Sequence, residues 1–329
     1  MKVLKISSTI IILLAVILIA GYTTGNQPER DSVGHVEKAL EIELESNFID
    51  VGEVTLHVVL AGPIDGEPVL LLHGFPEFWY AWRKPMAILA KAGYRVIVPD
   101  QRGYNLSDKP NGDEHYNLDE LTTDMSALVK KLGYEDVNLA AHDWGGGVAW
   151  WMVLHNPELV RRFFVIDTPH PSAGESFQTE EETNTWYRDF IRLPFIPTYL
   201  ARLNDWQMLT DTFVNGSKAN SFSPEDLDQF RSAWDHENAI NTMVAWYRAD
   251  NENIKEPESR QVDVPTMVVI APNDFYIPSD LTVRSMPFLN NGELLRLEQG
   301  SHWIIQEQPE MIAQHLIEFI ESEGISTTK

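Results

Sequence analysis

The stretch LAAHDWGGG, residues 139–147, places an aspartate where a sharp turn would project its side chain above a sheet. Asp143 has a small residue two positions away on either side, Ala141 and Gly145, which is the spacing of a strand-to-helix turn that presents a nucleophile. That position usually holds serine. A carboxylate there is suited to displacement at saturated carbon, because water can cleave the resulting alkyl ester. An aspartate before a helix is also a common N-cap, so the assignment needs support from elsewhere in the chain.

Two distant residues provide that support. Asp274 lies in VVIAPNDFYIP, just past a predicted strand, and His302 lies in EQGSHWIIQEQPE, before the last predicted helix. Nucleophile, acid and histidine in this chain order form a hydrolase triad when a sheet brings them together. Each residue alone has an ordinary explanation, since a loop aspartate is usually a turn former. Three such residues at strand ends favour a catalytic site.

The elements that must position these residues alternate between strands and helices. Apolar runs that predict strands span residues 51–62 (two short strands meeting at a turn), 68–74, 94–100, 137–143, 161–169, 264–272 and 292–299. Predicted helices span residues 82–93, 118–133, 145–160 and 309–324. This alternation implies right-handed crossovers and a mostly parallel sheet flanked by helices.

The interval from residue 171 to residue 251 breaks this rhythm. It is rich in Trp, Tyr and Phe and reads as several short helices. We interpret it as a helical cap inserted into an α/β core formed by residues 26–170 and 252–329, because the strand pattern resumes afterwards without a new start. A separate small domain is the alternative interpretation.

The N-terminus has the pattern of an export signal. Lys2 and Lys5 precede an uncharged apolar run from about Ile10 to Ala20, which is short for a membrane span. Residues 1–25 are therefore predicted to be a signal peptide, giving a periplasmic or secreted protein. An uncleaved N-terminal membrane anchor is the alternative.

The net charge and the cysteine content limit the kinds of partner that the protein can bind. The 329 residues carry a formal net charge of -24, which would repel nucleic acid phosphates, so nucleic acid binding is not expected. The chain has no cysteine, so it has neither disulfides nor a lipidated cysteine. A homodimer is left open by the sequence.

The motifs HGFPEFWYAWR (residues 73–83), PDQRGYNLSDKP (99–110), AAHDWGG (140–146) and GSHWIIQEQPE (300–310) together resemble epoxide hydrolases of the α/β-hydrolase family. The similarity spans about residues 43 to 320. The resemblance implies an α/β-hydrolase fold and hydrolysis of a hydrophobic epoxide to a vicinal diol, with no metal or organic cofactor.

The resemblance also assigns residue roles. It implies that Asp143 forms an ester with the substrate, that His302, oriented by Asp274, activates water, and that the cap phenols Tyr187 and Tyr247 hold the epoxide oxygen. The backbone amides of Phe75 and Trp144 would form the oxyanion hole. The aromatic side chains of Phe75, Trp144, Trp186 and Phe190 would line an apolar substrate pocket.

Two alternatives remain. A haloalkane dehalogenase would share Asp143 and could use the indole of Trp144 for halide, but Phe75 stands where that family usually has a donor asparagine. A non-catalytic binding protein could keep the same fold, because fold alone does not establish activity.

Overall fold

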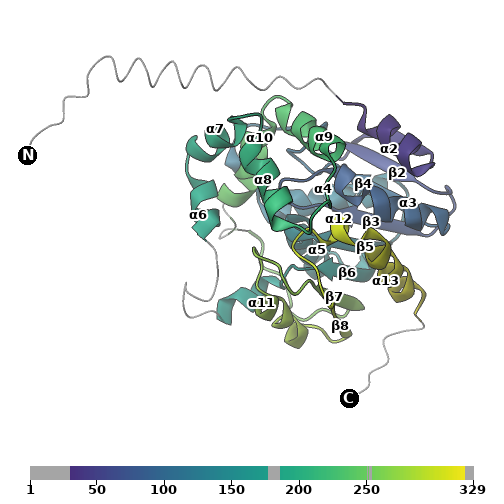
Figure 1. The fold of residues 1–329 in the computed structure, drawn as a ribbon. Coiled ribbons are helices and arrows are strands. Elements are labelled where there is room, and N and C mark those ends of the chain that lie inside the picture. Colours follow the sequence, from purple (N-terminus) through teal and green to yellow (C-terminus); the bar gives the residue numbers. More distant parts are fainter. Residues whose placement is uncertain (1–29, 177–185, 250, 252–253, 323–329) are drawn as a thin grey trace, which may run out of the picture.

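The computed structural model describes residues 30–176, 186–249, 251 and 254–322. Within them, eight strands form one sheet in the order β1-β2-β4-β3-β5-β6-β7-β8 (Figure 1). The strands are β1 (Leu44–Asp50), β2 (Thr55–Ala61), β3 (Pro68–Leu72), β4 (Arg95–Pro99), β5 (Val137–His142), β6 (Val160–Ile166), β7 (Thr266–Ile270) and β8 (Gly292–Arg296). Strand β2 pairs antiparallel with β1 and with β4, and every other pairing is parallel. The predicted mostly parallel sheet is confirmed.

The start of the sheet differs from the prediction. The two strands expected within residues 51–62 are instead β1, which ends at Asp50, and β2, with Val51 to Val54 forming the turn between them. Strand β1 has the sequence LESNFID and is mostly exposed, so hydrophobicity does not mark it. It is preceded by helix α2 (Ser32–Leu40), which Asp31 caps by accepting a hydrogen bond from the amide of Gly34.

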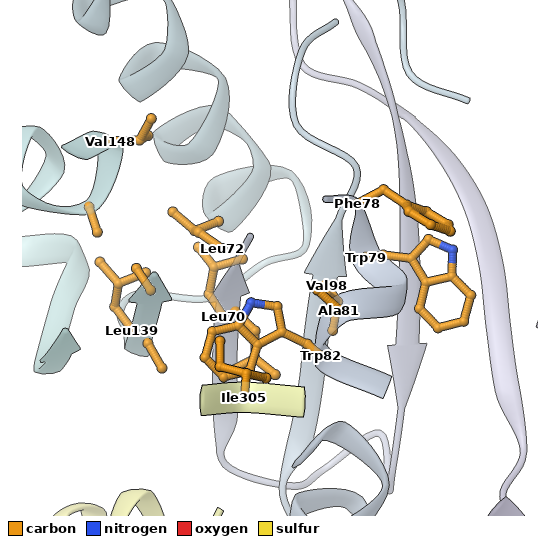
Figure 2. Packing of buried hydrophobic residues seen from close by; sticks show 14 of the residues in the cluster. Leu70, Leu72, Phe78, Trp79, Ala81, Trp82, Val98, Leu139, Val148 and Ile305 are labelled. Atoms are coloured by element: carbon orange, nitrogen blue, oxygen red, sulfur yellow. The ribbon is translucent and has the colours of Figure 1, made fainter. Parts of the chain in front are cut away.

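Helices flank the sheet in packed pairs. Helix α3 (Arg83–Lys91) packs against α13 (Pro309–Glu321), and α4 (Leu118–Lys131) packs against α5 (Asp143–His155). Figure 2 shows part of the core, in which Leu70 and Leu72 of β3, Leu139 of β5, Trp82 and Ile305 belong to one buried cluster. Leu70 pairs with Leu139 in the parallel register of β3 and β5. All of these side chains are buried, so the strand ends that carry the loops below rest on a rigid support.

The segment between β6 and β7 is helical where the structure describes it. Its elements are η4 (Pro171–Ser176), α6 (Trp186–Arg192), α7 (Ile196–Arg202), α8 (Gln207–Gly216), α9 (Pro224–Asp235) and α10 (Ala239–Arg248). Figure 1 shows α6 to α10, in green, gathered on one side of the molecule. The division of the chain into a core and a cap stays a prediction.

The predicted leader, residues 1–25, lies outside the described residues and also stays a prediction. In the part of the chain that is described, no helix combines the length and apolar character needed to cross a bilayer.

Candidate active site

Asp143 stands at the sharp turn between β5 and α5. It is the first residue of α5 and has a φ of 51°, in the left-handed region where a side-chain-bearing residue is strained. The turn packs so closely that a Cβ on Gly74 would lie 2.5 Å from the Cβ of Asp143. A Cβ on Gly145 would lie 2.5 Å from the carbonyl oxygen of His73. The two glycines are therefore required for this turn to fit against the loop after β3.

The two carboxylate oxygens of Asp143 have different surroundings. Oδ1 accepts a hydrogen bond of 2.8 Å from the backbone amide of Phe75. Oδ2 lies 3.7 Å from Nε2 of His302. One oxygen is thus held by a backbone donor, and the other faces the histidine.

His302 is bound to Asp274 on its far side. Nδ1 of His302 lies 2.7 Å from Oδ2 of Asp274, and both side chains are almost fully buried. The other oxygen of Asp274 accepts hydrogen bonds from the amides of Tyr276 at 2.7 Å and Ile277 at 2.9 Å. Because these bonds fix the carboxylate, the imidazole ring keeps one orientation.

The charges around His302 favour its protonated form. Burial alone would lower the pKa of this imidazole, but the charge and hydrogen bond of Asp274 and the charge of Asp143 outweigh burial and raise the pKa to about 9. At neutral pH the free protein therefore holds an imidazolium between two carboxylates.

A cavity of about 250 Å³ opens over this group. Asp143 and His302 line it together with the two predicted phenols, Tyr187 and Tyr247. The remaining wall is mostly apolar and consists of Phe75, Pro76, Trp186, Phe190, Ile191, Pro197, Ala201, Met208, Leu209, Thr212, Ile240, Val244, Phe275, Tyr276 and Trp303. The structure thus brings nucleophile, histidine and phenols to one apolar chamber.

The two phenols remain proton donors at neutral pH. Burial, and after it the negative charge of Asp143, raises the pKa of Tyr247 well above its usual value. Burial likewise raises the pKa of Tyr187, against a smaller opposing effect of Arg188. Tyr187 also lies with its hydroxyl 3.4 Å from the carbonyl oxygen of Tyr276.

Of the four aromatic residues predicted for the pocket, Phe75, Trp186 and Phe190 line the cavity. Trp144 is not among the lining residues, and this part of the prediction needs correction. Its indole packs edge-on against Tyr247, with ring centroids 5.0 Å apart. The side chain of Trp144 therefore packs against one of the two phenols. A role of its backbone amide in an oxyanion hole stays a prediction.

The sequence analysis missed two neighbours of the site. Tyr276 lines the cavity and contacts the ring of His302 at a centroid distance of 5.0 Å. Arg188 donates from Nε to the hydroxyl oxygen of Tyr187 at 3.2 Å. Each lies close in sequence to a predicted site residue, Tyr276 to Asp274 and Arg188 to Tyr187, but the residue types alone give no role.

No group of three or more His, Cys, Asp or Glu residues within the described ranges is arranged to hold a metal ion.

Known proteins similar to this chain include hydrolases with the same fold. The alpha/beta hydrolase fold family matches residues 67–309. An AB hydrolase superfamily protein of Bacillus subtilis is 34% identical over 283 residues, covering 85% of this chain and 99% of the relative. Epoxide hydrolase 1 of Caenorhabditis elegans is 32% identical, covering 84% of this chain and 70% of the relative. The crystal structure of a Bacillus megaterium epoxide hydrolase in complex with an inhibitor superimposes with a TM-score of 0.75 at 25% identity, covering 84% of this chain and 100% of that one.

Proposed function

The chain belongs to the alpha/beta hydrolase fold family and is an epoxide hydrolase, and we propose that it opens apolar epoxides through an ester of Asp143. The observation that carries the proposal is the shared cavity lined by a carboxylate, a histidine and two neutral phenols. These are the groups needed to attack an epoxide carbon and to stabilise the oxygen that leaves it.

The first half of the reaction uses the free oxygen of Asp143. Oδ2 attacks an epoxide carbon in line while Tyr187 and Tyr247 donate hydrogen bonds to the ring oxygen. That oxygen becomes an alkoxide and takes a proton from a phenol. Because burial keeps both phenols protonated, they are ready to donate before substrate arrives. The product is a hydroxyalkyl ester of Asp143.

The second half follows from the electrostatics of His302. Esterification removes the negative charge of Asp143, which is one of the groups that hold the pKa of His302 at about 9. The imidazole then releases its proton more easily and can take one from water, which attacks Cγ of the ester. The carbonyl oxygen in this step is Oδ1, which already accepts the amide of Phe75 at 2.8 Å. The proton that His302 releases restores the phenol. The bond between Cγ and Oδ2 then breaks, His302 returns the proton from water to the departing alkoxide of the diol, and the oxygen from water completes the carboxylate of Asp143.

The apolar wall indicates the substrate class. Asp143, His302 and the phenols are nearly the only polar groups on a surface built from aromatic and aliphatic side chains. Hydrophobic or aryl epoxides that fill about 250 Å³ are the substrates that this surface favours.

Halide release is less well supported. A dehalogenase would need the Trp144 indole at the cavity wall, whereas this indole packs against Tyr247 and is not among the lining residues. The phenols suit a developing alkoxide, which accepts strong hydrogen bonds.

The test is a parallel assay of the purified protein with styrene oxide and a primary bromoalkane, followed by a single turnover of styrene oxide in isotopically labelled water. Diol formation, with label found first in Asp143 after that turnover, is expected. Label that enters the diol directly would disprove the ester route. Inactivity on both substrates, with saturable binding of an epoxide, would instead favour a binding protein.

The proposal also assigns a cap to the helical segment between β6 and β7 and an export signal to residues 1–25. Helices α6, α7, α8 and α10 supply Tyr187, Tyr247 and much of the apolar wall, which supports the role of this segment as a cap. The basic and apolar residues 1–25 support export. Expression of the full chain and N-terminal sequencing of the extracytoplasmic protein would test export, since an unprocessed protein in the soluble cytosol contradicts it.

A further inference from the structure

A second buried histidine–aspartate pair lies outside the cavity described above. His57 of β2 and Asp100, which follows β4, are joined by a 2.6 Å contact between Nδ1 and Oδ2. Their side chains are 1% and 0% exposed. The carboxylate of Asp100 is fixed further by the amide of Trp79 at 3.0 Å and the side-chain amide of Asn105 at 2.7 Å. This carboxylate is therefore as firmly positioned as that of a triad.

A serine completes the arrangement. Phe48 of β1 stands opposite His57 in the antiparallel register, and Ser46, two residues earlier, points to the same face. The hydroxyl oxygen of Ser46 lies 2.9 Å from Nε2 of His57. Because ionised Asp100 can only accept, it places the proton of a neutral imidazole on Nδ1, and Nε2 is left to accept from the serine hydroxyl. The hydrogen bonds thus run from serine to histidine to aspartate.

The serine is accessible from a cavity of its own. Ser46 and His57 line a hollow of about 490 Å³, which shares no lining residue with the chamber over Asp143. The first turn of α2 also lines it, through Ser32 and Val33. The amide of Ser32 donates to the carbonyl oxygen of Arg30, and the amide of Gly34 donates to Oδ1 of Asp31, so neither of these two amides is available to an oxyanion.

We propose that Ser46 is the nucleophile of a second site that takes small polar esters. Its hydroxyl oxygen attacks the ester carbonyl carbon, and His57 accepts the proton and passes it to the departing alcohol. Water then attacks the acylated serine, His57 again takes the proton, and the carboxylic acid leaves while Ser46 regains its hydrogen. No oxidant, metal or cofactor takes part.

The setting of Ser46 implies slow turnover. Ser46 lies on an extended edge strand and not at a sharp turn like that of Asp143, where the backbone amide of Phe75 donates to the nucleophile itself. Attack on a fluorophosphonate is therefore the step best measured, because it needs the nucleophile and the base, releases fluoride, and requires no later release of an acyl group.

The experiment labels the full-length Asp143→Asn protein with a small fluorophosphonate and locates the adduct by peptide mass spectrometry. We expect one label per chain, on Ser46. Ser46→Ala in the same background should remove it, and His57→Gln should slow it by at least about tenfold. Ser259→Ala, at an exposed serine far along the sequence, should leave the label unchanged.

A second set of measurements tests whether loss of the label in Ser46→Ala results from misfolding. Thermal unfolding should show that Ser46→Ala is folded, and its epoxide turnover in the otherwise native chain should equal that of the parent protein. The same chain should hydrolyse p-nitrophenyl acetate more slowly than its parent. Labelling at other residues, or of Ser46 at the rate seen in urea-unfolded protein, would overturn the proposal and leave the epoxide reaction untouched.

Discussion

Two buried histidine–aspartate pairs in the described part of the chain, His302–Asp274 and His57–Asp100, differ in the group that faces Nε2 of the histidine. The His302–Asp274 contact is 2.7 Å and the His57–Asp100 contact is 2.6 Å. Nε2 of His302 faces a carboxylate oxygen at 3.7 Å, whereas Nε2 of His57 faces the hydroxyl of Ser46 at 2.9 Å. The same ring and acid are thus used with two different third groups.

The third group and its surroundings determine the chemistry. A carboxylate is already ionised and needs no base to attack, so His302 is required only after the ester has formed. A serine must lose its proton during attack, so His57 has to contact it from the start. The 3.7 Å contact at His302 is too long for a hydrogen bond, so Nε2 of His302 is not bonded to Asp143, whereas Nε2 of His57 lies within hydrogen-bond distance of Ser46. The two spacings therefore match two orders of events.

Removal of Asp143 should have the largest effect, because it should abolish epoxide turnover and leave the reactivity of Ser46 intact. Asp143→Ala should lower epoxide turnover by at least about 10⁴-fold, because the attacking atom is lost. Labelling of Ser46 should be unchanged. Diol formation followed by chromatography checks the first statement, with Asp211→Ala, at a surface position on α8, as the control. Turnover near the parent rate would refute the role of Asp143.

Replacement of His302 and replacement of His57 should have different effects on the ester that Asp143 forms with an epoxide. His302→Gln should slow release of the ester by about 10³-fold, because its water is no longer activated, while attack by Asp143 continues. Intact-mass spectrometry should then detect protein heavier by one substrate molecule. His57→Gln should show no such adduct with epoxide. An unmodified His302→Gln protein that is also inactive would indicate that His302 acts before the ester forms.

Tyr187 and Tyr247 line the cavity of the His302–Asp274 pair, whereas no tyrosine is among the described residues that line the hollow at His57. Tyr247→Phe and Tyr187→Phe should each reduce epoxide turnover by about 100-fold, since each removes one donor to the alkoxide. The double variant should lose more than either. Single-turnover rates of ester formation are the measurement, and Tyr199→Phe on α7 is the matched control. Equal losses in the control would mean that packing, and not hydrogen bonding, is responsible.

The pH dependence of stability should report on the pair at His302. Its pKa is raised from 6.5 to about 9, so folding is stabilised below about pH 6.5 and this contribution is lost as pH rises through about 9. The shift corresponds to a loss on the order of 3 kcal/mol in the free energy of unfolding. Urea unfolding across this range should show the slope, and His302→Gln should reduce it. Ser46→Ala should keep it, and an identical slope in His302→Gln would assign it to another group.

The site at Asp143 and His302 could be predicted from the sequence, whereas the arrangement of Ser46 and His57 could not. Asp143, Asp274 and His302 adjoin strong strand signals and stand in motifs with known spacing, so their meeting at one edge of the sheet follows from the topology. Ser46 lies on β1, whose polar, exposed residues give no strand pattern. Its contact with His57 depends on the antiparallel register, which hydrophobicity did not reveal here. The direction of the Trp144 indole likewise depends on packing against Tyr247 and not on chain position.

The smallest effect is expected at Asp167, a third buried carboxyl beside the His302 pair. It follows β6, is 0% exposed, and accepts the amide of Ala271 at 2.8 Å. Burial, reinforced by the charge of Asp274, raises the pKa of Asp167 well above its usual value, which favours the neutral form of this group. Asp167→Asn keeps its shape and lack of charge, and turnover should change by less than about threefold. The pH profile of epoxide turnover is the measurement. A loss as large as that of Asp274→Asn would mean that Asp167 is ionised and shares the work of orienting His302, a feature that the His57–Asp100 pair does not have in the described structure.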